Sequence, residues 1–132
     1  MHPIQLAERE VSRQISDYLG WLGWRRIRNQ SGVATNAGGS TFRFGEKGIP
    51  DLLFLRYIPE HPGVALVLWV ETKRAKGKLS PEQLKWQHDE RLRGALIANA
   101  FSLETFSEWY HETLGWIHTA DGPPIPGNLH LF

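Results

Sequence analysis

The feature that most restricts the fold is an unbroken run of seven apolar residues, Val64 to Val70, followed at once by Glu71, Thr72 and Lys73. A short apolar run of this length is typical of a β-strand buried within a sheet. Side chains alternate across a strand, so Glu71 and Lys73 point to one face and Thr72 to the other. The sequence therefore predicts a core strand that ends in an acid and a base on the same face.

A second strand is expected to place another acid beside this strand end. The stretch "DLLFLRY" begins at Asp51, directly after Pro50, which cannot donate to a strand ladder. If the turn "IPEHPG" joins the two strands as an antiparallel hairpin centred near residue 61, Asp51 lies beside Glu71. Neighbouring carboxylates repel each other unless a cation lies between them, and oxygen ligands suit Mg²⁺ or Mn²⁺. The pattern predicts a hard-metal site with Lys73 at its edge.

The plainest alternative for Glu71 and Lys73 is a surface ion pair, which would stabilise the fold by about 0 to 1 kcal/mol. The two residues alone favour this ion pair. The position of Asp51 on the neighbouring strand favours the metal site.

A third carboxylate is expected from the first helix. Apolar residues at 3.6-residue spacing from Ile4 to Leu22 predict a helix with one apolar stripe. At about 100° per residue, Glu8 lies within this stripe and Glu10 lies about a quarter-turn outside it. A buried acid costs free energy unless it is paired or binds a metal, so Glu8 is the preferred site residue. The alternative is that Glu8 favours only the helix macrodipole, an effect of about 0.3 to 1 kcal/mol.

The remaining patterns predict one α/β domain with a mixed sheet flanked by helices. The stretch 30–40 is expected to be a loop, because it is rich in glycine and polar residues. Residues 115–132, with three prolines and three glycines, are expected to form an irregular tail on or near the domain of residues 1–114. The expected order is αββββαβα, with helices at 4–22, 80–94 and 102–114 and strands at 24–29, 41–44, 51–57, 64–73 and 95–101.

The helix at 80–94 has clear end signals. Ser80 suits the N-cap, Pro81 the first helical position and Gly94 the position just past the end. Gln83 occupies the third helical position, where its side chain can reach back to the Ser80 backbone N–H in a capping box. In this interpretation, Gln83 serves only as a cap and stabilises the helix by about 1 kcal/mol.

Net charge gives no global argument for a polyanionic partner, because 15 Lys and Arg balance 14 Asp and Glu. Local clusters of basic residues are better evidence for such a partner, although a run of charged residues usually just lies on a solvent-exposed face. Arg74, Lys76 and Lys78 follow Lys73 and adjoin the expected metal site, which favours phosphate contacts. The glycine-rich stretch 31–47 is expected to act as a mobile clamp on a phosphate-bearing partner. Its cationic side chains are Arg43 and Lys47.

The cellular setting is expected to be the cytoplasm. The chain has no Cys, which excludes disulfides and thiolate metal sites and suits a reducing compartment. The first ten residues carry charges where a signal peptide needs an apolar segment, and the run at 64–70 is too short to cross a bilayer. The six His have no zinc-ligand spacing, and no nucleophile-elbow or P-loop pattern occurs. No membrane partner and no organic cofactor are expected.

Longer segments around these residues resemble a known family. "GIPDLLFL" followed by "VLWVETK" resembles the PD...ExK signature of the PD-(D/E)XK nuclease superfamily. The segments "AEREVSRQISDYL", "FGEKGIPD" and "KGKLSPEQ" are similar to one branch of it, the VRR-NUC (virus-type replication-repair nuclease) domains. The resemblance covers about residues 8 to 106.

The resemblance implies a set of site residues. Asp51, Glu71 and the main-chain carbonyl of Thr72 would hold one or two Mg²⁺ or Mn²⁺ ions, with Glu8 bound directly or through water. Lys73 would orient or help deprotonate the attacking water. Gln83 would donate to a phosphate oxygen or position that water. The implied site is thus Glu8, Asp51, Glu71, Thr72, Lys73 and Gln83.

The activity implied is that of a metal-dependent DNA endonuclease of the phage or prophage type. Its expected substrates are flap, branched or four-way junction DNA, and a homodimer is expected because stand-alone members of the family act as dimers. The alternative is a non-catalytic module on the same fold that binds nucleic acid or protein.

Overall fold

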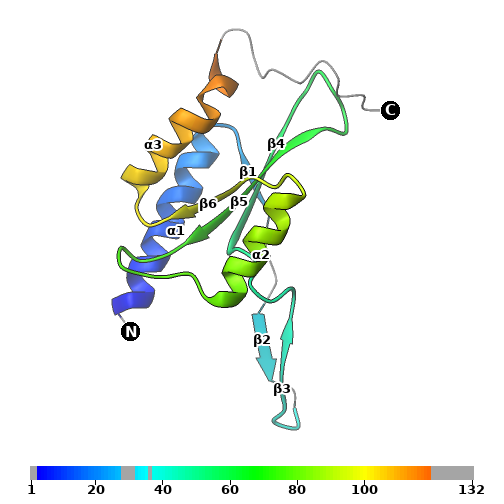
Figure 1. Cartoon of the computed structure of the whole chain (residues 1–132), viewed down its shortest axis with the longest axis vertical. Helices are drawn as coiled ribbons and strands as arrows, with labels where there is room; N and C mark the ends of the chain where they lie inside the picture. The colour runs from blue at the N-terminus through cyan, green and yellow to red at the C-terminus, as the bar shows by residue number, and fades with distance from the viewer. Residues whose placement is uncertain (1–2, 28–31, 36, 120–132) are drawn as a thin grey trace.

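The computed structural model describes residues 3–27, 32–35 and 37–119. The three helices expected from the sequence are all present, in the expected order along the chain (Figure 1). The elements are α1 (Pro3–Trp21), β1 (Arg25–Ile27), β2 (Gly32–Thr35), β3 (Thr41–Phe44), β4 (Leu52–Tyr57), β5 (Ala65–Thr72), α2 (Pro81–Leu92), β6 (Ile97–Ala100), α3 (Leu103–Leu114) and the 3₁₀-helix η1 (Gly115–His118).

The main sheet is mixed, in the order β1-β4-β5-β6. Strands β4 and β5 pair antiparallel, and β5 and β6 pair parallel through α2. The register runs from Leu52 opposite Val70 to Tyr57 opposite Ala65. This hairpin is therefore centred on residue 61, as expected, and Asp51 and Glu71 follow as the next opposed positions.

One face of this sheet packs against α1 and α3, which lie side by side (Figure 1). Tyr110 on α3 is fully buried there, and its hydroxyl accepts a 2.8 Å hydrogen bond from the Trp24 indole N–H. Burial of such side chains supplies most of the stabilisation of a domain of this size. The core includes Ile15, Leu19, Phe54, Leu68, Val70, Ala98, Phe106, Tyr110 and Leu114.

Helix α2 lies on the opposite face of the sheet. It begins as the sequence predicts: the Ser80 hydroxyl accepts from Gln83 N, the Gln83 side chain accepts from Ser80 N, and Pro81 is the first helical residue. It ends with Gly94 at φ +101°, a left-handed conformation that favours glycine. The capping box therefore fixes the start of the helix next to the end of β5.

The loop expected at residues 30–40 is wrong in part, because Gly32–Thr35 form strand β2. It pairs antiparallel with β3 as a separate two-stranded hairpin, so β3 does not join the main sheet. The β-branched residues in "GVAT" favour a strand more than the surrounding glycines oppose it. The hairpin projects away from the sheet at the end where β4 starts (Figure 1).

The first residues of the expected tail are also more regular than predicted. Gly115–His118 form η1, and Ile117 is buried in the core beside α3. The rest of the tail, residues 120–132, lies outside the described residues, as do residues 28 and 29 of the expected first strand. Within the described part, no helix is long and apolar enough to span a membrane.

Candidate active site

Asp51 and Glu71 meet at the end of the β4–β5 hairpin. Asp51 is exposed, and its Oδ2 accepts hydrogen bonds from Thr72 N at 3.3 Å and Thr72 Oγ1 at 3.0 Å. Glu71 is only 2% exposed and lies one residue before the end of β5. The strand therefore carries an acid into the interior beside a second acid at the surface.

Glu71 is held in a setting that disfavours its charge. Burial raises the pKa of Glu71 to about 8, and the negative charge of Asp51 with a hydrogen bond between the two carboxyl groups adds to this. The nearby Lys73 lowers the pKa and the charge of Glu8 raises it, both more weakly. A carboxylate with this set of neighbours is stabilised in its charged form by an added cation.

Lys73 lies on the same side as Glu71, as alternation along the strand predicts. Its Nζ is 3.7 Å from Glu71 Oε2, and its side chain is 15% exposed. The ion pair is thus mostly buried, unlike the surface pair considered from the sequence. The lysine lies at the rim of the two acids, where it can reach solvent.

Gln83 forms the expected cap and also contacts Glu71, with different atoms of one amide. Its Oε1 accepts from Ser80 N at 2.8 Å in the capping box, and its Nε2 donates to Glu71 Oε1 at 3.2 Å. The cap orients the amide so that its N–H faces the buried carboxylate. Gln83 therefore links the start of α2 to Glu71.

The loop before Asp51 is anchored to the same helix. The Trp86 indole N–H donates to Glu46 Oε2 at 2.6 Å. Gly48 has φ +85°, and a Cβ there would lie 2.3 Å from the Glu82 carbonyl oxygen. Only glycine allows this close approach in this conformation. The loop that carries Asp51 and the helix that carries Gln83 are thus held together.

A cleft of about 350 Å³ opens beside these acids. Glu8 lines it and is half-buried, whereas Glu10 is exposed and ion-paired with Arg13. The helical phase that favours Glu8 over Glu10 is thus correct. Arg9 and Arg26, which sequence reasoning did not assign to the site, add cations to a cleft lined by Glu8, Arg9, Ser12, Arg26, Asp51, Leu52 and Thr72.

The possible ligands at the site suit a hard divalent cation, because all of them are oxygen atoms and the carboxylates of Asp51 and Glu71 are neighbours. The expected cluster of three carboxylates is not preformed. Within residues 3–27, 32–35 and 37–119, no three acidic, histidine or cysteine side chains lie close enough to hold a metal. Glu8 lines the cleft together with Asp51, and its charge acts on Glu71, but the three acids do not form such a cluster.

The predicted cationic residues are placed unevenly around the site. Lys76 and Lys78 are exposed in the turn after β5, and Arg74 is half-exposed. Lys47 lies 3.5 Å from Glu82 in an exposed ion pair, so it contacts α2. Arg43 belongs to β3, opposite Val33, and its side chain lies outside the described residues.

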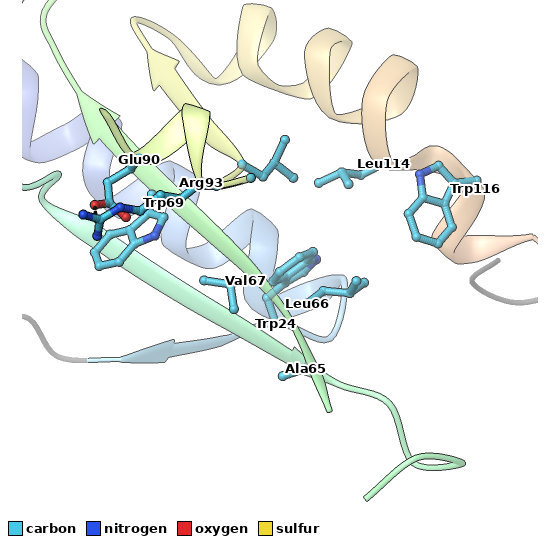
Figure 2. A pocket seen from close by; sticks show the side chains of 12 residues that line it. Trp24, Ala65, Leu66, Val67, Trp69, Glu90, Arg93, Leu114 and Trp116 are labelled. Carbon is cyan, nitrogen blue, oxygen red and sulfur yellow. Dashed lines mark hydrogen bonds and ion pairs between the residues drawn. The ribbon is translucent and has the colours of Figure 1, made fainter. Parts of the chain in front are cut away.

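A second hollow, of about 520 Å³, lies at the other end of β5. Figure 2 shows Trp24, Trp69 and Trp116 around it, with Glu90 and Arg93 at one side. Among the residues that line this hollow, Glu90 is the sole acid, so the hollow has no pair of carboxylates. The chemistry of the molecule is therefore concentrated at the Asp51–Glu71 end.

A comparison with solved structures identifies this architecture. A solved "VRR_NUC domain" superposes with a TM-score of 0.57 and 23% sequence identity, over 82% of this chain and 97% of that chain. The chain has the VRR-NUC fold. No protein-family model matches the sequence, and no curated protein matches it either.

The element order of this chain agrees with the order predicted from the sequence, apart from the additional strand β2 and the 3₁₀-helix η1. In this fold the chain brings Asp51, Glu71, Lys73 and Gln83 to one end of the sheet, with Glu8 across the cleft. The arrangement places oxygen ligands that suit a divalent cation beside cationic side chains that suit a phosphate.

Proposed function

We propose that this chain is a divalent-metal-dependent DNA endonuclease that hydrolyses phosphodiester bonds. The observation that carries the proposal is the meeting of Asp51 and buried Glu71, with Lys73 3.7 Å from Glu71, at one end of a VRR-NUC fold. Paired acids with a lysine at their rim match the needs of phosphodiester hydrolysis, which requires charge stabilisation and an activated water.

The acids would hold the metal. Asp51, Glu71 and the main-chain carbonyl of Thr72 would bind one or two Mg²⁺ or Mn²⁺ ions, with Glu8 acting directly or through water. A bound ion of this kind lowers the pKa of a water molecule and stabilises the charge that develops on phosphate oxygens.

The other residues have distinct roles in this proposal. Lys73 orients the attacking water or helps to deprotonate it, and it neutralises the scissile phosphate, as a compact cation with movable donors can. Gln83 holds the Glu71 carboxylate through Nε2, a role that replaces the direct phosphate contact expected from the sequence. Arg9 and Arg26 lie in the cleft where they can contact phosphates.

The substrate is proposed to be DNA with a flap, a branch or a four-way junction. Lys76 and Lys78 in the turn after β5 would contact the DNA backbone, together with Arg74, Lys47 and the β2–β3 hairpin that carries Arg43. By its family resemblance, the enzyme is proposed to be of the phage or prophage type and to act in the cytoplasm of a bacterial host.

A homodimer is part of the proposal. A four-way junction has two symmetric scissile strands, and one chain offers one such site, so paired cuts require two copies related by a two-fold axis. Light scattering at micromolar concentration is expected to give the mass of a dimer. A monomer that still makes concerted cuts in junctions would contradict this part.

The proposal is tested by incubating labelled duplex, flap and four-way junction DNA with Mg²⁺ or Mn²⁺, with Ca²⁺ and with EDTA. Cleavage is expected with Mg²⁺ or Mn²⁺ and is expected to disappear with EDTA and in Glu71→Ala. Ca²⁺ is expected to support binding without cleavage, because its looser coordination aligns the water poorly. In EDTA, DNA binding by Glu71→Ala is expected to equal that of the parent, because burial raises the pKa of Glu71 to about 8 and the metal-free carboxyl carries little charge at pH 7.

The second candidate is a non-catalytic module that binds nucleic acid or protein on the same fold. It is favoured by the lack of a preformed three-carboxylate cluster among the described residues. DNA binding without scission in any of the tested metals would support this module and refute the nuclease.

A further inference from the structure

Helix α2 is attached to the sheet through a stripe of polar side chains. Residues at every fourth position of the helix point to the same side, because four residues are close to one helical turn. Each of three successive members of this stripe donates a hydrogen bond to the sheet. The contacts are Gln83 to Glu71 Oε1 at 3.2 Å, Gln87 to Asn99 Oδ1 at 2.8 Å and Arg91 to the Ile97 carbonyl at 3.0 Å.

The middle contact is a reciprocal amide pair in the interior. Gln87 is 1% exposed, and Asn99 Nδ2 returns a hydrogen bond to Gln87 Oε1 at 3.0 Å. Two antiparallel hydrogen bonds between planar amides hold both the distance and the orientation of the partners. This pair is more directional than an apolar contact at the same place would be.

The amide pair lies next to the candidate site. Asn99 on β6 is the register partner of Glu71 on β5, so the two side chains stand side by side on the face that α2 covers. Neighbouring strands are about 4.8 Å apart, and four residues of a helix span about 6 Å. Gln83 over β5 and Gln87 over β6 therefore hold α2 at two points across two strands.

Apolar packing does little to hold α2 at one place along the sheet. Gln87 is the one buried residue in the helix, while Leu84 and Leu92 are 55% and 77% exposed. Trp86 packs edge-on against Trp69 with ring centroids 5.0 Å apart. An aromatic contact of this kind tolerates small shifts of the helix along its axis, whereas paired hydrogen bonds do not.

We propose that Gln87 and Asn99 are positioning residues that set the location of α2 so that the Gln83 amide meets Glu71. They act through Gln83 and touch neither substrate nor metal. The effect on metal binding and cleavage rests on the proposed nuclease function, but the effect on the Gln83 amide does not.

The decisive variant replaces both amides by apolar groups of similar shape, Gln87→Met with Asn99→Leu. Replacing both partners of a buried polar pair is often neutral or stabilising, so this variant is expected to melt no lower than the parent. A second double variant, Gln87→Asn with Asn99→Gln, reverses the pair and keeps its total length and both hydrogen bonds. His88→Asn is the matched control, because His88 is the exposed neighbour on the same helix.

The direct readout is the ¹H–¹⁵N signal of the Gln83 side-chain amide in the metal-free protein, assigned by its disappearance in Gln83→Glu. The apolar pair is expected to move this signal towards that of a solvent-exposed glutamine, and the reversed pair and His88→Asn are expected to keep it near the parent. The proposal is overturned if the apolar pair leaves the signal at its parental position, or if both double variants move it equally.

The second readout is Mn²⁺ affinity measured by calorimetry. The apolar pair is expected to bind Mn²⁺ about tenfold more weakly than the parent, the usual effect of removing a group that supports a metal ligand. The reversed pair is expected to bind like the parent. Unchanged affinity in the apolar pair, in a parent that binds Mn²⁺, would refute the positioning role. A parent protein that binds no Mn²⁺ and cuts no DNA would refute the proposed nuclease function. The Gln83 amide signal would still test whether Gln87 and Asn99 position α2.

Discussion

Helices α1 and α3 cover one face of the sheet with apolar side chains, whereas α2 covers the other face with amides and a guanidinium. On the first face, Ile15, Phe106 and Tyr110 are buried in a continuous core. On the second, Gln83, Gln87 and Arg91 make the contacts with the sheet. The first face thus provides most of the stability, and the second provides the orientation of the candidate site.

The two faces are therefore expected to respond differently to mutation. Apolar packing tolerates small displacements but loses much free energy when volume is removed. Hydrogen bonds between α2 and the sheet contribute less free energy, but they fix the positions of the side chains that make them. Variants that remove volume from the apolar core under α1 and α3 should mainly lower stability, and variants of the polar contacts of α2 should mainly lower activity.

The largest expected change in stability is on the apolar face. Phe106→Ala should lower the free energy of unfolding by about 3 to 5 kcal/mol, because it leaves a cavity beside Tyr110. Leu92→Ala on exposed α2 surface should change it by less than about 0.5 kcal/mol. Urea unfolding of both variants measures the contrast. Equal losses would mean that α2 also stabilises the fold through apolar burial.

A pH-dependent stability is expected from Glu71 on the polar face. The folded-state pKa of Glu71 is raised to about 8 from a usual value of 4.5. Between these values the folded chain holds a proton that the unfolded chain has lost. The resulting stability is fully present below the unfolded pKa and is lost as the pH rises through 8.

Glu71→Gln removes this titration and isolates its effect. The metal-free variant should match the parent below about pH 4.5 and become progressively more stable than the parent as the pH rises to about 8, with a constant difference above that pH. Thermal unfolding in EDTA across this range checks the prediction. A constant difference between the two proteins at all pH values would show that burial of Glu71 does not disfavour its charge.

Gln83→Glu separates the cap of α2 from the contact with Glu71. A glutamate keeps the capping box and adds a favourable charge near the helix N-terminus. It also replaces the N–H that faces Glu71 by an oxygen. The cleavage rate should fall about tenfold, a barrier increase of about 1.4 kcal/mol, with the helix start intact. If this variant cuts DNA as fast as the parent, Gln83 acts as a cap alone.

Glu8 and Glu10 provide a paired test at the cleft. Glu8→Gln should lower the cleavage rate about tenfold, since Glu8 lines the cleft beside Asp51. Glu10→Gln should leave the rate unchanged, because Glu10 is exposed and paired with Arg13. Single-turnover rates on the preferred DNA substrate compare the two. The reverse result would place the wrong face of α1 towards the site.

The parts of the site that depend on local rules could be predicted from the sequence. Strand alternation and a hairpin centred at residue 61 place Asp51, Glu71 and Lys73 together. Helical phase distinguishes Glu8 from Glu10, and capping preferences place Ser80 and Gln83 at the start of α2. Each of these features depends on residues close in sequence or on one turn.

The features that depend on where elements dock could not be predicted in this way. The Gln87–Asn99 pair forms only because α2 crosses from β5 to β6, and neither residue stands out in the sequence. The place of Glu8 at the cleft and the close approach of Gly48 to α2 have the same origin. Strand β2 could not be predicted because only Val33 and Thr35 favour a strand and glycine-rich sequence flanks them.

Mn²⁺ binding to the metal-free protein, monitored by electron paramagnetic resonance and calorimetry, tests whether the end of the β4–β5 hairpin is a metal site. The parent and Glu10→Gln are expected to bind Mn²⁺ alike, whereas Glu71→Ala and Asp51→Ala are expected to lose this binding while remaining folded. Equal Mn²⁺ binding by the parent and by Glu71→Ala would contradict a metal site at the end of the β4–β5 hairpin.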